Sequence, residues 1–396
     1  MNNRQIVNLT QKYVANTYAR FPIALVRGKG ARVWDADGNE YLDFVAGIAV
    51  NSLGHSHPAI VRAIERQARK LVHVSNLYHI APQSELAREL SRLSFAERVF
   101  FCNSGAEANE AAIKLARRYG IDRLGGKYEI LSTLNSFHGR TLATMTATGQ
   151  EKVRHGYDPL PSGFRHVPYN DLRAMEDAVD EKTTAAILVE PIQGEGGVVV
   201  PDMSYLQGLR ELCNRRGLLL IFDEVQVGMG RTGKLFAYQH FGVEPDIMTL
   251  AKALGGGLPL GAMLAKEEVA QSFSPGSHAS TFGGNPLVCG VAMAVVRTLV
   301  RGGVLKNCAR MGKVLYQGLQ SFKDRFSFIR EVRGKGLILG MELERDGSEI
   351  VKDCLKNGLL INCTAGSVLR LLPPLTIGKK DIDHALTILE KVLTRQ

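Results

Sequence analysis

Short apolar segments alternate with helical segments through the middle of this 396-residue chain. The apolar segments are residues 98–102, 128–133, 185–190, 217–223, 246–250 and 261–265. Each has the length of a strand, and several are apolar throughout, which is typical of strands covered on both faces by helices. The alternation therefore predicts an α/β fold built on a mostly parallel sheet.

The two ends of the chain have different patterns. Residues 33–45 predict a β-hairpin, because the turn dipeptide Asp37-Gly38 lies between two β-rich runs. After about residue 300, helices and strands follow in an order typical of a small α+β module. A chain of this length also exceeds the size at which one core usually stops growing. The parts we expect are an N-terminal segment (1–53) that packs with the small domain, a large domain (54–300) and a small C-terminal domain (301–396).

Charge and cysteine content exclude several classes of partner. The net charge is +10, but basic and acidic residues are interspersed, so we expect a solvated surface and no nucleic-acid partner. The six cysteines form no C-x-x-C pair and predict buried thiols in a reducing compartment. The first residues lack the apolar run of a signal sequence, and the run Leu218–Phe222 is too short to span a bilayer. We therefore expect a cytoplasmic protein with no membrane partner.

Chemically capable side chains follow two of the expected strands. Asp223 and Glu224 come directly after an apolar run, at the strand end where doubly wound sheets bind ligands. A carboxylate buried there needs a cationic partner, although a helix cap or a salt bridge would also explain it. Lys252 follows the strand at 246–250 and precedes three glycines. In apolar surroundings desolvation lowers the pKa of a lysine, which favours the nucleophilic neutral amine, whereas most lysines lie at the surface.

Other motifs are suited to anions. Residues 104–106 open a helix directly after a strand, where free N–H groups and the helix dipole attract phosphate, although an ordinary helix cap has the same sequence. Phe137 offers an aromatic plane, and Arg140 beside it can hold a carboxylate in bidentate fashion. Arg370 lies among apolar residues and needs an anionic partner, which Glu195 can provide in the absence of substrate.

Together these side chains predict a pyridoxal-phosphate site that also binds a dicarboxylate. The lysine would link covalently to the cofactor, and the carboxylate would keep the ring nitrogen of the cofactor protonated. The helix start would bind the phosphate, and the two arginines would bind substrate carboxylates.

Six longer motifs make the chain resemble the class III pyridoxal-phosphate-dependent aminotransferases over about residues 10–393. They are NSGAEANEAAIK (103–114), FHGRT (137–141), VEPIQGEGG (189–197), LLLIFDEVQVGMGRTG (218–233), TLAKALGGGLPLGA (249–262) and STFGGNP (280–286). Their joint occurrence in this order is highly specific. The resemblance implies a fold type I pyridoxal-phosphate-dependent transferase, with a large domain whose mostly parallel sheet is flanked by helices and a smaller α+β domain. It also implies a homodimer with the active site at the subunit interface.

The resemblance assigns roles to individual residues. Lys252 is expected to carry the cofactor and Asp223 to pair with its ring nitrogen, which makes both catalytic. The other cofactor-binding residues it implies are Ser104, Gly105 and Ala106 at the phosphate, Phe137 stacked on the ring, Glu224, Val225 and Gln226 near the ring, and Thr281, which reaches the phosphate of the other subunit. The substrate-binding residues it implies are Arg140, Arg370, Ser280, Ile48 and Glu195, the last as the movable partner of Arg370.

The expected reaction transfers an amino group from an acylated ornithine to 2-oxoglutarate. Ile48 stands where ornithine δ-aminotransferases resemble one another in having a tyrosine, and an apolar wall there favours an acyl-capped substrate. Acetyl and succinyl donors are both compatible with the sequence, and ornithine and 4-aminobutyrate remain alternatives. A non-catalytic protein that binds pyridoxal phosphate is a further alternative, which the intact Lys252 disfavours.

Two other motifs do not predict a site. GMGRTG at 228–233 has the spacing of a dinucleotide-binding loop, but DEVQV separates it from the strand and no acid follows at the required distance. His55 and His57 are spaced like metal ligands, but no cysteine or acid converges with them, so we expect a turn or helix-cap role and no metal.

Overall fold

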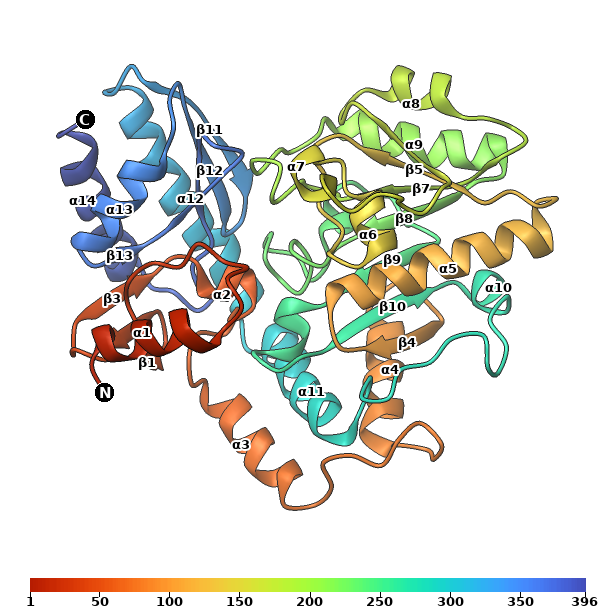
Figure 1. Cartoon of the computed structure of the whole chain (residues 1–396), viewed down its shortest axis with the longest axis horizontal. Helices are drawn as coiled ribbons and strands as arrows, with labels where there is room; N and C mark the ends of the chain where they lie inside the picture. The colour runs from red at the N-terminus through yellow and green to blue at the C-terminus, as the bar shows by residue number, and fades with distance from the viewer.

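A seven-stranded sheet forms the centre of the larger lobe of the molecule (Figure 1). The computed structural model describes residues 1–396. In spatial order the strands are β4 (Arg98–Cys102), β10 (Gly261–Ala265), β9 (Ile247–Leu250), β8 (Leu219–Asp223), β7 (Thr184–Val189), β5 (Glu129–Thr133) and β6 (Phe164–Val167). Only β10 runs antiparallel to its neighbours. The predicted mostly parallel α/β sheet is confirmed, and β6 is a strand that the apolar pattern did not predict.

Helices cover the faces of this sheet because its central strands are apolar on both sides. Every residue of β7, β8, β9 and β10 is buried. The helices of the larger lobe are α3 (Pro58–Ala68), α4 (Ala81–Leu93), α5 (Gly105–Arg123), α6 (Leu142–Ala147), α7 (Glu151–Arg154), α8 (Leu172–Ala178), α9 (Met203–Arg216), α10 (Glu267–Ala270) and α11 (Pro286–Arg301). The alanine and leucine stripe of α5 faces inward as its spacing indicates.

The smaller lobe combines both ends of the chain (Figure 1). Its C-terminal elements are α12 (Val304–Lys323), β11 (Ile329–Lys335), β12 (Ile338–Leu343), α13 (Ser348–Lys356), β13 (Leu359–Leu360), β14 (Asn362–Thr364), β15 (Val368–Leu371) and α14 (Lys379–Leu393). Its N-terminal elements are α1 (Asn3–Tyr13), β1 (Leu25–Lys29), β2 (Arg32–Asp35), β3 (Glu40–Asp43) and α2 (Ala46–Ala49). β3 pairs in parallel with β13, so the two ends share a sheet.

Several local predictions agree with the structure. β2 and β3 form the hairpin expected around Asp37-Gly38, and His57 caps α3 by accepting a hydrogen bond from the N–H of Ala59 (3.2 Å). α3 itself runs from Pro58 to Ala68. The domain limits at 53/54 and 300/301 stay a prediction.

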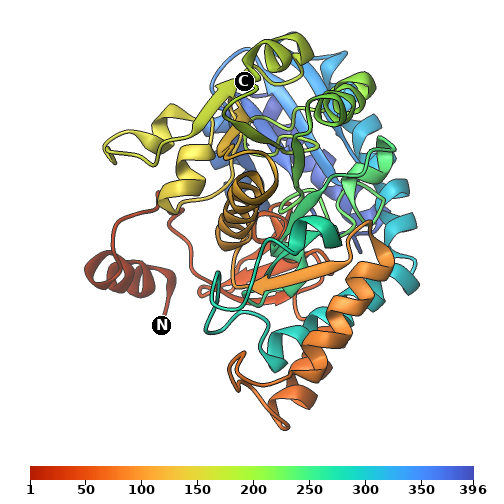
Figure 2. The same ribbon diagram turned by 90° about the vertical axis from the view of Figure 1, so that its right-hand side faces the viewer.

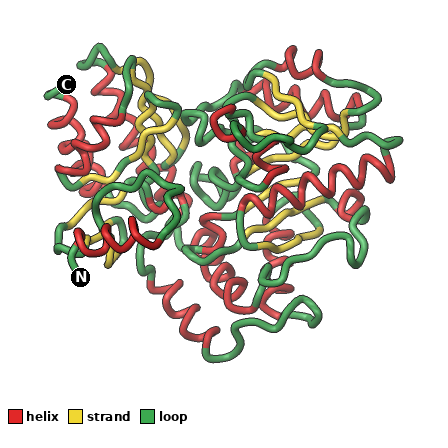
Figure 3. Tube along the Cα trace, in the orientation of Figure 1, coloured by secondary structure: helices red, strands yellow, loops and turns green.

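Helix α1 stands away from the body of the molecule in the turned view (Figure 2). No single helix is long and apolar enough to cross a membrane; α11 and α12 reach the required composition only as a pair, and they are bent by 64° at the break. Figure 3 shows that loops gather between the two lobes.

Candidate functional site

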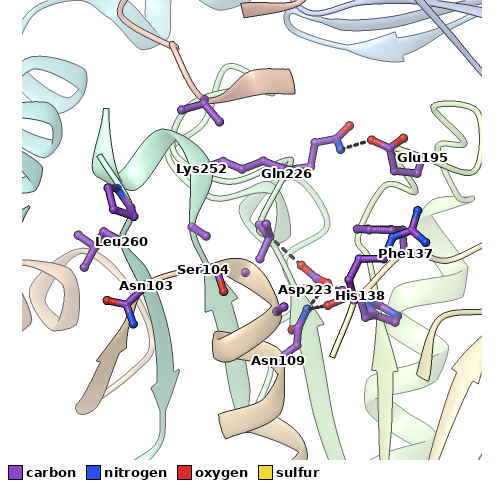
Figure 4. Close-up of a pocket in the computed structure, with 18 of the residues that line it drawn as sticks. Asn103, Ser104, Asn109, Phe137, His138, Glu195, Asp223, Gln226, Lys252 and Leu260 are labelled. Atoms are coloured by element: carbon purple, nitrogen blue, oxygen red, sulfur yellow. Dashed lines mark hydrogen bonds and ion pairs between the residues drawn. The ribbon is translucent and has the colours of Figure 1, made fainter. Parts of the chain in front are cut away.

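One cavity of about 470 Å³ is formed where loops that follow the strands of the large sheet converge (Figure 4). Its lining includes ten of the residues singled out from the sequence: Ser104, Gly105, Ala106, Phe137, Arg140, Glu195, Asp223, Val225, Gln226 and Lys252. They come from segments that are up to about 150 residues apart in the chain. The sheet therefore brings most of the predicted site residues to a single location.

Lys252 begins the 3₁₀ helix η2 (Lys252–Gly255) directly after β9. Its φ is +44°, a left-handed conformation that is rare for any residue except glycine and is often retained at functional sites. Burial is the main reason that the pKa of Lys252 lies below its usual 10.5, and the charge of Arg370 adds to this effect. Glu195 and Asp223 oppose it. The environment thus favours the neutral amine that a nucleophile requires.

Asp223 ends β8, and its buried carboxylate is held from three sides (Figure 4). Asn109 donates to Oδ2 (2.8 Å), the Nδ1 atom of His138 lies 2.7 Å from the same oxygen, and the N–H of Val225 donates to Oδ1 (3.0 Å). Asn109 is itself fixed, because it accepts a hydrogen bond from Thr249 (2.8 Å). Asp223 is therefore oriented to meet a cationic group in the cavity.

The N-terminus of α5 supplies the anion-binding end of the cavity. The Ser104 hydroxyl caps the helix by accepting a hydrogen bond from the N–H of Glu107 (3.2 Å). The first N–H groups of a helix have no partner within the helix and attract anions. A Cβ on Gly105 would lie 2.7 Å from Cγ1 of Val225, so glycine is required for this close packing. The arrangement is suited to a phosphate group.

Arg370 on β15 is fully buried and approaches the cavity from the smaller lobe. Its Nη1 donates to Glu195 (2.5 Å) and to Gln226 (3.0 Å), and Gln226 donates to Glu195 (3.0 Å). Burial opposes ionisation of Glu195, but Arg370 and Lys252 outweigh it and hold the pKa of Glu195 below its usual value. The Nη2 atom of Arg370 is buried without a partner. Arg370 therefore retains donor capacity for an incoming carboxylate.

Phe137 and Arg140 also line the cavity. The guanidinium of Arg140 is exposed and lies 5.6 Å from the centroid of the Phe137 ring. Glu190, which follows β7, accepts hydrogen bonds from the N–H groups of Phe137 (3.0 Å) and Gly194 (3.1 Å). Burial is the main reason that the pKa of Glu190 is raised to about 7.

Sequence reasoning missed three side chains of this site: Asn109, His138 and Glu190. Each lies inside one of the six motifs, which was the signal that could have identified them. Glu190 stands at the end of the strand expected at 185–190, and His138 lies between Phe137 and Arg140 in the chain, but only the contacts with Asp223 and Phe137 show what these side chains do.

Four of the predicted residues lie outside the main cavity, in addition to Arg370. Glu224 faces the other way and accepts hydrogen bonds from the N–H groups of Ala237 (2.6 Å) and Tyr238 (2.7 Å). Ser280 and Thr281 line a neighbouring cavity that shares Asn103 with the first. The fourth is Ile48, described below with its turn.

Ile48 belongs to a left-handed turn, because Ala46, Gly47, Ile48 and Ala49 all have positive φ. Its side chain is exposed, and Val50, two residues later, lines the cavity instead. The turn is anchored by Asp43, which accepts hydrogen bonds from the N–H groups of Val45 and Ala46 (both 2.9 Å) and contacts His55 (2.7 Å). His55 therefore serves a local structural role, as expected from its surroundings.

Comparison with known proteins gives one consistent result. The profile of the family described as "Aminotransferase class-III" matches residues 13–393. Acetylornithine aminotransferase of Caldanaerobacter subterraneus subsp. tengcongensis is 54% identical over 391 residues, which cover 98% of this chain and 99% of the relative. Acetylornithine aminotransferase of Methanocaldococcus jannaschii is 51% identical over 397 residues, which cover 100% of this chain and 99% of the relative. A solved ornithine aminotransferase from Toxoplasma gondii, which has partial occupancy of PLP at its active site, superposes with a TM-score of 0.96 at 35% identity. The superposition covers 100% of this chain and 94% of the Toxoplasma gondii chain.

Proposed function

Because the chain belongs to the class III aminotransferase family, we propose that it transfers the δ-amino group of N2-acetyl-L-ornithine to 2-oxoglutarate. The products are N-acetyl-L-glutamate 5-semialdehyde and L-glutamate, and the reaction is a step of arginine biosynthesis. The choice of donor rests on the identity of 51–54% to acetylornithine aminotransferases over the whole length. The geometry of the cavity supports the type of reaction.

The residues of the cavity fit pyridoxal 5'-phosphate. The start of α5 at Gly105 and Ala106 suits the phosphate, Phe137 suits the aromatic ring, and Asp223 suits the protonated ring nitrogen. Burial lowers the pKa of Lys252, which favours the neutral amine that would link to the cofactor. When bound, this cofactor stabilises the negative charge that develops at the substrate carbon.

Each residue then has a defined task. Lys252 would hold the cofactor covalently and, once released, carry the proton between the substrate carbon and the cofactor as a general acid–base. Asp223, fixed by Asn109 and His138, would keep a proton on the ring nitrogen. Gln226 would approach the ring hydroxyl, and Glu224 would act only through its position beside Asp223.

The two arginines would bind the carboxylates of the two substrates. Arg140 would bind the α-carboxylate of the donor, while Glu195 neutralises Arg370. When 2-oxoglutarate enters, Glu195 would move away and Arg370 would bind one of its two carboxylates. Ile48 and Val50 would form an apolar wall near the acyl group. This division explains how one cavity handles a donor with one carboxylate and an acceptor with two.

The second subunit is part of the proposal. Thr281 and its neighbour Phe282 are exposed, Phe282 to 61%, beside the cavity that adjoins the main one. An exposed phenylalanine next to a predicted phosphate ligand is suited to an interface. In a homodimer Thr281 would reach the phosphate in the partner's cavity, and Ser280 would lie near the substrate.

The test compares four donors by kcat/KM: acetylornithine, succinylornithine, ornithine and 4-aminobutyrate, each with 2-oxoglutarate. Acetylornithine should give the highest value. A clear preference for ornithine would instead support the activity of the Toxoplasma gondii protein. A protein that binds pyridoxal phosphate but shows no change of its visible absorption with any donor would be non-catalytic.

A further inference from the structure

Arg231 is a fully buried arginine without a carboxylate partner. It lies in the loop after β8, and its side chain is 0% exposed. Burial lowers the pKa of its guanidinium to about 10, and no carboxylate opposes this effect. A buried charge without a counter-charge is strongly unfavourable, and an apolar side chain of similar size would avoid the penalty. The arginine therefore needs a reason other than charge pairing.

The guanidinium joins three segments that are far apart in the chain. Nη1 donates to the carbonyl oxygens of Leu337 (2.9 Å) and Pro373 (2.5 Å), and Nη2 donates to Oγ of Ser52 (3.2 Å). Leu337 lies in the turn between β11 and β12, Pro373 follows β15, and Ser52 belongs to the N-terminal segment. One side chain of the larger lobe thus contacts both ends of the chain.

The backbones of the two lobes also lie close together around Arg231. The N–H of Leu337 donates to the carbonyl oxygen of Arg231 (3.0 Å), so these two residues are joined by two hydrogen bonds, one from the side chain of Arg231 and one to its backbone. Gly336 has a φ of +60°, and a Cβ there would lie 2.5 Å from the carbonyl carbon of Thr232. The two lobes are therefore packed backbone against backbone at Arg231.

The acceptors of Arg231 lie next to residues of the cavity. Pro373 is three residues after Arg370, and Ser52 is two residues after Val50. Gln226, which contacts Arg370 at 3.0 Å, precedes Arg231 on the same loop. A shift of the smaller lobe along this loop would therefore displace Arg370 relative to Gln226.

We propose that Arg231 is a positioning residue that sets the distance of Arg370 from the larger lobe, and so the affinity of the cavity for dicarboxylates. This inference rests on the proposed role of Arg370 as a carboxylate clamp. The guanidinium is suited to the task because its planar fork can serve three acceptors in fixed directions, which neither lysine nor methionine can do.

The experiment measures binding of glutarate, a dicarboxylate that cannot react, to the cofactor-loaded enzyme. Arg231→Lys should weaken glutarate binding by about tenfold or more, because small displacements of a binding group have large effects. The first half-reaction with acetylornithine should be affected less than glutarate binding, because the donor leaves the Arg370–Glu195 pair intact. Arg231→Met removes all three contacts and should weaken glutarate binding further; if it fails to fold, Arg231→Lys carries the test.

Hydrogen exchange provides a readout that needs no activity. The N–H of Leu372 donates to Phe44, and the N–H of Leu375 donates to Ser52 (both 2.7 Å). Both amides bridge the C-terminal part and the N-terminal segment, and both should exchange faster in Arg231→Lys than in the wild type. Unchanged exchange would overturn the proposal.

The control is Met175→Ala, which truncates a buried side chain of α8 that is not part of the lining of the main cavity. It should lower the Tm without changing glutarate affinity. Wild-type glutarate affinity in Arg231→Lys, or an equal loss in Met175→Ala, would overturn the positioning role. Because glutarate binding and hydrogen exchange do not depend on the donor, a wrong donor assignment would leave this test intact.

Discussion

Removal of Glu195 should make the enzyme bind dicarboxylates more tightly. In the free enzyme Nη1 of Arg370 donates to Glu195 at 2.5 Å, and an incoming carboxylate must break this contact before it can use Arg370. Arg370 is fully buried, whereas 27% of the Glu195 side chain is exposed, so Glu195 is the partner that can move.

The size of the effect follows from the contact that is lost. A hydrogen bond to a charged group contributes about 1.5–3 kcal/mol net, so its absence should favour the dicarboxylate complex by about 2 kcal/mol, or about 30-fold in Kd. Donor binding should change less, because the Arg370–Glu195 pair is intact both in the free enzyme and in the donor complex.

Glutarate titration of the cofactor-loaded enzyme, followed by calorimetry, measures this shift for wild type and Glu195→Ala. The matched control is Glu176→Ala, which removes an Arg–Glu pair of similar geometry at the surface, where Arg215 lies 2.9 Å from Glu176. Its glutarate Kd should equal that of the wild type. An unchanged or higher Kd in Glu195→Ala would refute the view that Glu195 competes with substrate for Arg370.

Three other perturbations test the rest of the site. Lys252→Ala should lower kcat by at least about 10²–10⁴-fold, because the general acid–base is lost; near-normal transamination in rapid-mixing assays would contradict the assignment. Arg140→Ala should raise the KM for acetylornithine by about tenfold or more with an unchanged Tm, because a bidentate carboxylate contact is lost; a fall in Tm alone would exclude the clamp. Burial raises the pKa of Glu224 from 4.5 to about 8, so between these values the folded state binds more protons and stability should fall as pH rises. Urea unfolding at pH 5 and pH 8 should show that Glu224→Gln gains stability relative to the wild type as the pH rises.

Much of the fold was predictable because its signals are local. Apolar runs of strand length, the Asp37-Gly38 turn and the start of α5 after β4 are each specified by a few consecutive residues. β6 was missed because two of its four residues are half-buried and one is exposed, so no continuous apolar run marks it.

The sequence by itself determined most of the secondary structure, the mostly parallel sheet and the positions of Lys252 and Asp223 at strand ends, because these depend on short-range patterns. It could not determine which way a side chain faces once the strand has ended. Asp223 and Glu224 are adjacent in sequence, yet only Asp223 lines the cavity. The contact between Arg370 and Glu195 was expected mainly from the family resemblance, and only the tertiary structure brings these two residues together across 175 positions of the chain. Such contacts depend on how the two lobes pack, and the free energy of that packing is distributed over the whole interface, so no single motif encodes it.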